Sequence, residues 1–89
     1  MKKYVVKDSI INIKTGEQQT WYVGKDGYVH DERTKEFADG YARKGDAQRR
    51  INRDKAWYIT WEKAQVINPY TIQERDWLHV MTIEERESD

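Results

Sequence analysis

Alternating apolar and polar residues dominate the first third of the chain and predict strands there. Residues 3–14 and residues 18–23 are rich in β-branched and aromatic side chains, which favour strands. The Gly-Lys-Asp-Gly sequence at 24–27 lies between apolar runs and is typical of a hairpin turn. Residues 28–30 would return as a third strand. The pattern therefore predicts a three-stranded antiparallel meander over residues 3–31.

A helical pattern follows in the middle of the chain. Asp46 comes directly after a glycine and can cap the free N–H groups of a helix that starts there. One helical stripe then collects the apolar residues Ala47, Ile51, Tyr58 and Trp61. We predict a helix from residue 46 to about residue 66. Residues 57–62 also alternate as a strand would, so a strand in the segment 57–66 remains an alternative to the end of the helix.

Less regular segments complete the chain. Residues 31–40 read as a connection with a short helical turn, for which Phe37 and Tyr41, four residues apart, are the expected core anchors. An Asn-Pro dipeptide ends the helical segment, because the residue before proline is pushed out of helical geometry. Residues 71–76 are then a connection and residues 77–83 a final strand. Residues 84–89 form an acidic tail that we expect to fray.

Together these elements predict one small α+β domain over residues 1–89. The expected architecture is βββαβ: the meander, one main helix packed on the sheet, and a final strand beside an earlier one. Four Trp, six Tyr and one Phe would supply much of the core. The residues expected in the core are Ala47, Ile51, Trp61 and Trp77. The rings expected at the surface come from Tyr22, Tyr28 and Tyr70.

The residue types available for chemistry are few. The chain has no Cys, two His and two Ser, and neither Ser lies in a nucleophile elbow. Neither His has a second His at ligand spacing, and a metal site needs three or four converging ligands. We therefore predict a protein that is not an enzyme, with no catalytic residue, no metal and no cofactor. No apolar run approaches the ~18 residues of a membrane span, which predicts no membrane partner and a cytoplasmic location.

Charge is distributed unevenly although 16 basic and 16 acidic residues cancel. Residues 43–55 carry six basic and two acidic side chains, whereas residues 84–89 carry four acids and one arginine. The basic segment suits a solvated face, a protein contact or nucleic acid, and zero net charge disfavours nucleic acid. Exposed Tyr beside Arg is the composition of binding hot spots. The candidate partner-binding residues are Tyr22, Tyr28, Arg49, Arg50, Arg53, Glu84, Glu85 and Glu87.

Two motifs carry a resemblance to a group of known proteins. Trp21 to Tyr28 reads Trp-Tyr-Val-Gly-Lys-Asp-Gly-Tyr, and Lys44 to Ala47 reads Lys-Gly-Asp-Ala before the basic helix. With Phe37 between them and a closing strand, the chain resembles small proteins of Gram-positive phages and mobile elements. Some proteins of that size inhibit host machinery, including anti-CRISPR proteins. The resemblance covers most of the chain but assigns no functional residue.

The functional prediction combines the charge pattern with this resemblance. We expect a non-catalytic phage or mobile-element protein that inhibits a host protein in the bacterial cytoplasm. An anti-CRISPR inhibitor of a nucleic-acid-processing effector is its sharpest form, acting by steric block or by acids placed where phosphates would lie. The alternatives are a nucleic-acid-binding accessory protein that uses the basic helix 43–55, and a structural component of the virion. Homo-oligomerisation is compatible with each of them.

Overall fold

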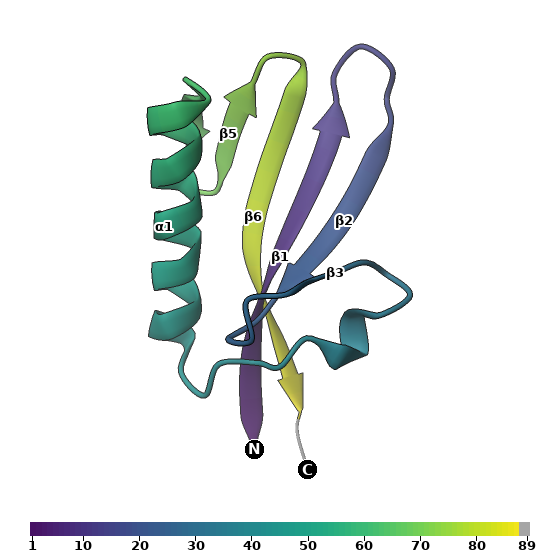
Figure 1. Ribbon diagram of the computed structural model, residues 1–89, viewed down its shortest axis with the longest axis vertical. Coiled ribbons are helices and arrows are strands. Elements are labelled where there is room, and N and C mark those ends of the chain that lie inside the picture. The colour runs from purple at the N-terminus through teal and green to yellow at the C-terminus, as the bar shows by residue number, and fades with distance from the viewer. Residues whose placement is uncertain (88–89) are drawn as a thin grey trace.

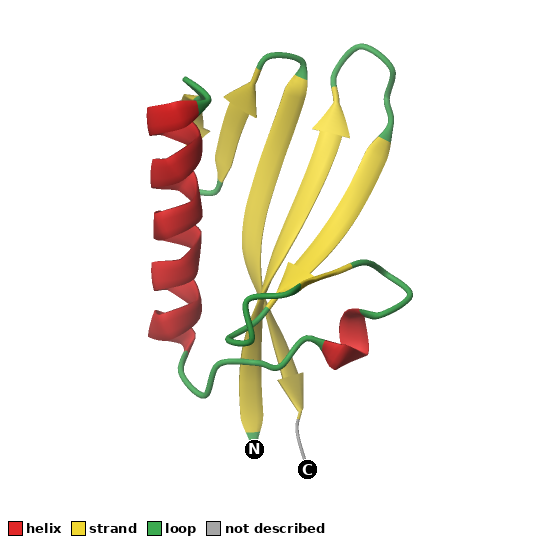
Figure 2. Ribbon diagram, in the orientation of Figure 1, coloured by secondary structure: helices red, strands yellow, loops and turns green. Residues whose placement is uncertain are grey.

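The computed structural model describes residues 1–87 and has the α+β class expected from the sequence (Figures 1 and 2). One helix packs beside a six-stranded antiparallel sheet with the strand order β3-β2-β1-β6-β5-β4. The strands are β1 (Lys2–Asn12), β2 (Gln18–Val23), β3 (Val29–His30), β4 (Gln65–Asn68), β5 (Thr71–Glu74) and β6 (Trp77–Glu87). The two longest strands, β1 and β6, therefore lie side by side at the centre of the sheet.

The sheet is larger than predicted. The antiparallel hairpins at the N-terminus are present, but a sheet limited to that meander and one final strand is wrong. Residues 65–74, expected as helix end and connection, form the β4–β5 hairpin instead. Pro69 lies in the turn of this hairpin, where its missing N–H removes no bond from the ladder.

The acidic segment at the C-terminus is not a frayed tail in the part that the structure describes. Residues 84–87 continue β6, and Glu84 pairs with Val5 while Glu87 pairs with Lys2 of β1. Residues 88–89, the rest of the predicted tail, lie outside the described residues. The backbone of the acidic segment is thus held by a central strand.

The helix α1 (Lys44–Trp61) is shorter than predicted at its C-terminal end. Lys63 adopts a left-handed conformation with φ of 57°, and the Ala64 N–H donates to the carbonyl oxygen of Tyr58 at 3.1 Å. Ala64 then turns into the core, whereas Trp61 is 70% exposed. The strand alternative for residues 57–66 is therefore wrong for residues 57–61, which are helical, and right for residues 65–66, which begin β4. The expectation that Trp61 belongs to the core is also wrong.

The main core lies between α1 and one face of the sheet. Ala47 and Ile51 are fully buried, as predicted, against Val6, Ile72 and Met81. These small and branched side chains let the helix approach β1 and β6 closely. Trp77, also expected in this core, is only half-buried.

The opposite face of the sheet is covered near the two termini by the chain between β3 and α1 (Figure 1). This segment, residues 31–43, contains the short helix η1 (Lys35–Phe37) and is joined to β1 by paired backbone hydrogen bonds between Tyr41 and Tyr4. Its buried residues are Ala38, which packs on Val5, and Gly40. Of the two predicted anchors, Phe37 is 67% exposed, whereas Tyr41 is half-buried and packs against the main core. We call this segment the crossing loop.

Candidate functional site

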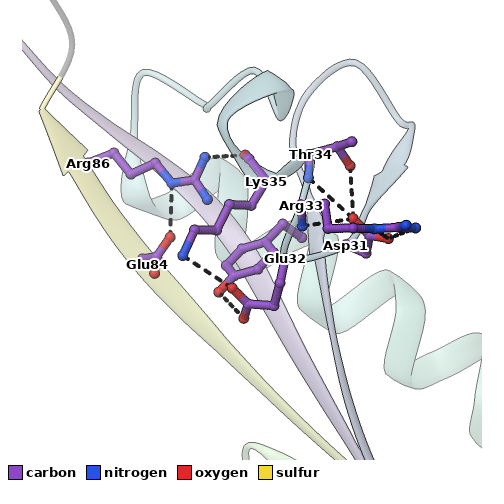
Figure 3. Close-up of polar contacts among 8 residues, drawn as sticks. Asp31, Glu32, Arg33, Thr34, Lys35, Glu84 and Arg86 are labelled. Atoms are coloured by element: carbon purple, nitrogen blue, oxygen red, sulfur yellow. Dashed lines mark hydrogen bonds and ion pairs between the residues drawn. The ribbon is translucent and has the colours of Figure 1, made fainter.

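The predicted binding residue Tyr22 is buried under the crossing loop. Its side chain is 2% exposed, so the expectation that this ring lies at the surface is wrong. The hydroxyl donates to Glu32 Oε1 at 2.9 Å, and Lys35 Nζ lies 3.1 Å from the other oxygen of that carboxylate (Figure 3). Burial, together with the hydrogen bond to Glu32, raises the pKa of Tyr22 to about 12. This tyrosine is a structural member of the fold.

Arg86 completes the cluster around this ring (Figure 3). Its guanidinium lies 5.2 Å from the ring centroid of Tyr22, at cation–π distance. Nε donates to Glu84 at 2.9 Å and Nη1 donates to the Lys35 carbonyl oxygen at 2.6 Å. The end of β6 is thereby bound to η1, and the charged groups of the cluster are matched by one another.

The acids predicted as a phosphate mimic also have cationic neighbours. Glu84 pairs with Arg86, Glu85 lies 3.4 Å from Lys2 Nζ, and Glu87 lies 4.0 Å from the N-terminal amino group. Glu85 and Glu87 are exposed and Glu84 is half-buried. Their charges are therefore partly neutralised along the strand, which weakens their use as a free acidic surface.

The predicted arginines separate into two groups on α1. Arg50 is half-buried, and its Nε donates to both oxygens of Asp54 at 3.1 and 3.2 Å. Arg49 is exposed and lies 3.7 Å from Asp46. Arg53 is exposed and has no ion-pair partner among residues 1–87. Of the three predicted arginines, Arg49 and Arg53 are therefore the ones exposed at the surface.

Two tryptophans extend this arginine surface along α1. Arg49, Arg53, Trp57 and Trp61 follow one another at intervals of four residues, which places them in one row on the helix. Trp57 is 51% exposed and Trp61 is 70% exposed. We call these four residues the Arg–Trp row. The sequence prediction missed both exposed rings and placed Trp61 on the same stripe as Ala47 and Ile51. The interval of four from Arg49 to Trp61 is the sequence signal of the row.

A groove runs beside this row, between α1 and the strands β1 to β3. Its volume is about 320 Å³. The apolar walls are formed by Ile10, Trp21, Val23, Val29, Trp57 and Tyr58. Asp8, Arg50 and Asp54 supply the charged groups of the lining. We call this hollow the α1–β2 groove. The exposed Tyr28, whose surface position was correctly expected, directly precedes Val29 of its rim.

A buried histidine lies next to this groove. His79 is 4% exposed, and its ring stacks at a tilt on Tyr58 with 4.5 Å between centroids. Nδ1 lies 3.9 Å from an Asp8 oxygen and Nε2 lies 3.5 Å from a Glu74 oxygen. Burial, and then the charges of Asp8, Glu74 and Asp54, raise the pKa of Tyr58. The side chains around His79, next to the groove, therefore include two carboxylates, those of Asp8 and Glu74.

Among residues 1–87, no three His, Asp or Glu side chains converge as a metal-binding group. In the same part of the chain, no helix has the length and apolar character needed to cross a bilayer. Comparison with protein-family models, with curated proteins and with solved structures found no match for this chain.

Proposed function

We propose that this domain is a non-catalytic binding protein that attaches to a protein partner through the Arg–Trp row. The observation that carries the proposal is the exposure of Trp57 and Trp61 beside Arg53, which has no ion-pair partner in residues 1–87. Large rings normally contribute to cores, and each can bury roughly 150–250 Å². Trp and Arg are also the residue types most enriched among interface hot spots.

The finer form of the proposal is inhibition of a host protein by occupying its surface, as an anti-CRISPR protein does. The resemblance to phage proteins supports this form, and the row supports a steric mode of action. Mimicry of phosphates by Glu84, Glu85 and Glu87 receives less support, because these acids are paired with cations along β1 and β6. A steric inhibitor needs only a rigid scaffold and a few anchors.

Single-stranded nucleic acid is the second candidate partner, and the row also favours it. Bases stack on exposed Trp rings, and Arg49 and Arg53 lie where a phosphate backbone would pass. The zero net charge of the chain argues against it, since nucleic-acid-binding domains are usually basic. Fluorescence anisotropy with labelled oligonucleotides in low salt decides: binding that falls steeply with salt and is lost in an Arg49→Glu, Arg53→Glu variant favours nucleic acid.

The protein-partner proposal is tested by comparative capture from a bacterial lysate. Wild type, a Trp57→Ala, Trp61→Ala variant and a Phe37→Ala variant are immobilised, and retained proteins are quantified by mass spectrometry. Phe37 is the matched control, because its ring is 67% exposed and it belongs to η1, the short helix that Figure 1 shows apart from α1. We expect a protein that wild type and the Phe37 variant retain and the double variant loses. Equal capture by all three proteins would overturn the proposal.

A protein identified in this way allows the anchors to be measured singly. Isothermal titration with the purified partner should show that Trp57→Ala and Trp61→Ala each cost about 2 kcal/mol or more of binding free energy. Tyr28→Ala tests the rival anchor predicted from sequence, since this ring is 73% exposed on the β2–β3 turn. A large loss for Tyr28 with none for either tryptophan would move the interface to that turn.

A further inference from the structure

The α1–β2 groove is continuous with the Arg–Trp row because one residue belongs to both. Trp57 lines the groove and is also the third member of the row. Its ring stands edge-on to Tyr58, with centroids 5.3 Å apart and planes at 88°. A partner seated on the row therefore reaches the mouth of the groove without any movement of the helix.

The charges in the groove are unbalanced toward negative. The charge of Asp54 is matched by Arg50, whose Nε donates a hydrogen bond to Asp54 Oδ2 at 3.1 Å. Asp8 has no Lys or Arg partner among residues 1–87, and its Oδ1 is buried without a hydrogen bond. Glu74 does not line the groove, but its carboxylate lies 3.5 Å from His79 Nε2 and adds a negative charge nearby. An occupant that carries a positive charge would compensate this excess.

The shape of the groove defines the rest of the occupant. Trp21, Trp57 and Tyr58 offer aromatic surfaces on which a cation and an aliphatic stem both pack well. A volume of about 320 Å³ lies at the low end of the ~300–1,000 Å³ that enclose drug-sized ligands. That size suits one long side chain.

We propose that the α1–β2 groove accepts an arginine or lysine side chain of the protein partner, with its stem on Trp21 and Trp57 and its cation near Asp8. This inference rests on the proposed function, since it names the chemistry that the partner presents beside the Arg–Trp row. A carboxylate ligand for Arg50 is the competing occupant, and the experiment includes it.

The probes are four N-acetylated, N′-methylamidated amino acids: arginine, lysine, norleucine and glutamate. They are titrated into the full chain, and the four Trp indole N–H signals are followed by NMR after assignment with Trp→Phe variants. We expect arginine and lysine to shift the Trp21 and Trp57 signals and to bind about tenfold more tightly than norleucine, a neutral control that keeps the four-carbon stem of lysine without its ammonium group. Glutamate should bind more weakly than norleucine.

Variants of the protein separate the groove from the general charge of the surface. Asp8→Asn should reduce arginine binding to the level of norleucine, whereas Asp46→Asn, which changes an acid of α1 outside the groove, should leave it unchanged. Val29 lies on the rim and is 58% exposed, so its substitution spares the core. Val29→Glu should tighten arginine binding and Val29→Lys should weaken it. These two variants test whether a cation binds in the groove even if Asp8→Asn fails to fold.

The outcomes are distinct from those of the capture experiment. Norleucine binding as tightly as arginine, tighter binding of glutamate, or equal affinity in the two Val29 variants would each overturn the inference. The proposed function would survive such a result, because capture through Trp57 and Trp61 does not require an occupied groove. If the Trp57→Ala, Trp61→Ala variant captures the same proteins as wild type while arginine still binds in the groove, the proposed function alone is overturned.

Discussion

The two faces of the sheet use similar residues in opposite ways. Under the crossing loop, Tyr22 is buried and its neighbours Lys35 and Arg86 are bonded to acids or to backbone. On α1, Trp57 and Trp61 stand at the surface beside Arg53, which has no such bond in residues 1–87. Both regions combine aromatic rings with cations. One of them is complete within the domain, whereas the other is open to a partner.

The difference lies in what covers each ring. The crossing loop returns over β2 and packs closely against its end. A Cβ built on Gly24 would lie 1.8 Å from the Asp39 carbonyl oxygen, so only glycine leaves room for this contact. The backbone N–H of Lys25 donates to that same oxygen at 2.9 Å. No described segment lies over Trp61 in this way, since it is 70% exposed. A ring beside a cation becomes a functional candidate only when the chain leaves it uncovered.

The largest expected effect is the difference in folding stability between variants of the buried ring and variants of the exposed ring. Tyr22→Ala should lower the free energy of unfolding by about 3–5 kcal/mol, because it empties a buried site and leaves Arg86 without its ring. Trp61→Ala should change it by less than about 0.5 kcal/mol, as expected for a surface position. Urea denaturation followed by far-UV circular dichroism measures both. Equal losses in the two variants would mean that Trp61 is also part of a core.

A second stability effect tests the two sides of the helix itself. Ile51→Ala should cost about 2–5 kcal/mol, because Ile51 is fully buried between α1 and the sheet. Arg53→Ala, two positions further and exposed, should stay within about 0.5 kcal/mol of wild type. The same denaturation assay applies. A loss below about 0.5 kcal/mol for Ile51 would remove it from the core and would place the helix differently on the sheet.

Local sequence patterns predicted those parts of the fold that local interactions determine. The glycine turn at 24–27, the first two strands and the buried pair Ala47 and Ile51 all follow from spacing and turn chemistry. The exposed position of Tyr28 could be predicted for the same reason, because it follows directly on that turn.

Long-range coverage could not be read from the same patterns. Tyr22 and Trp61 look alike as apolar members of periodic segments, yet only a returning segment distant in sequence buries the first. The end of α1 was missed because Lys63 takes a left-handed conformation that is usual for glycine or asparagine. In the β4–β5 hairpin, Val66 has one apolar neighbour and Ile72 lies between two polar residues, so neither segment shows a strand pattern, and an Asn-Pro break separates them. The predicted binding residues consequently include Tyr22, which is buried, and omit the exposed rings of Trp57 and Trp61.

A third experiment compares the arginines of the two regions. Arg86→Ala should destabilise the fold by about 1.5–3 kcal/mol, because hydrogen bonds that involve charged groups link this guanidinium to Glu84 and to the Lys35 carbonyl. Arg49→Ala should have almost no effect, since its pairing with Asp46 is solvent-exposed. Thermal unfolding of both variants at equal ionic strength is sufficient. An effect of Arg86→Ala as small as that of Arg49→Ala would show that β6 does not need η1.

The smallest effect concerns the ionisation of the covered ring. The folded pKa of Tyr22, about 12, lies above the ordinary value of 10.0, because burial and the bond to Glu32 both disfavour the phenolate. The stability that this tyrosine contributes is therefore fully present below pH 10 and is lost as the pH rises through 12. We expect the free energy of unfolding to fall over this interval in wild type and to fall less in Tyr22→Phe. Trp61→Phe, a ring change on the open side, should keep the wild-type slope. If Tyr22→Phe and wild type show the same slope, the hydroxyl of Tyr22 is not held against Glu32 in solution, and the crossing loop covers this face less tightly than its contacts indicate.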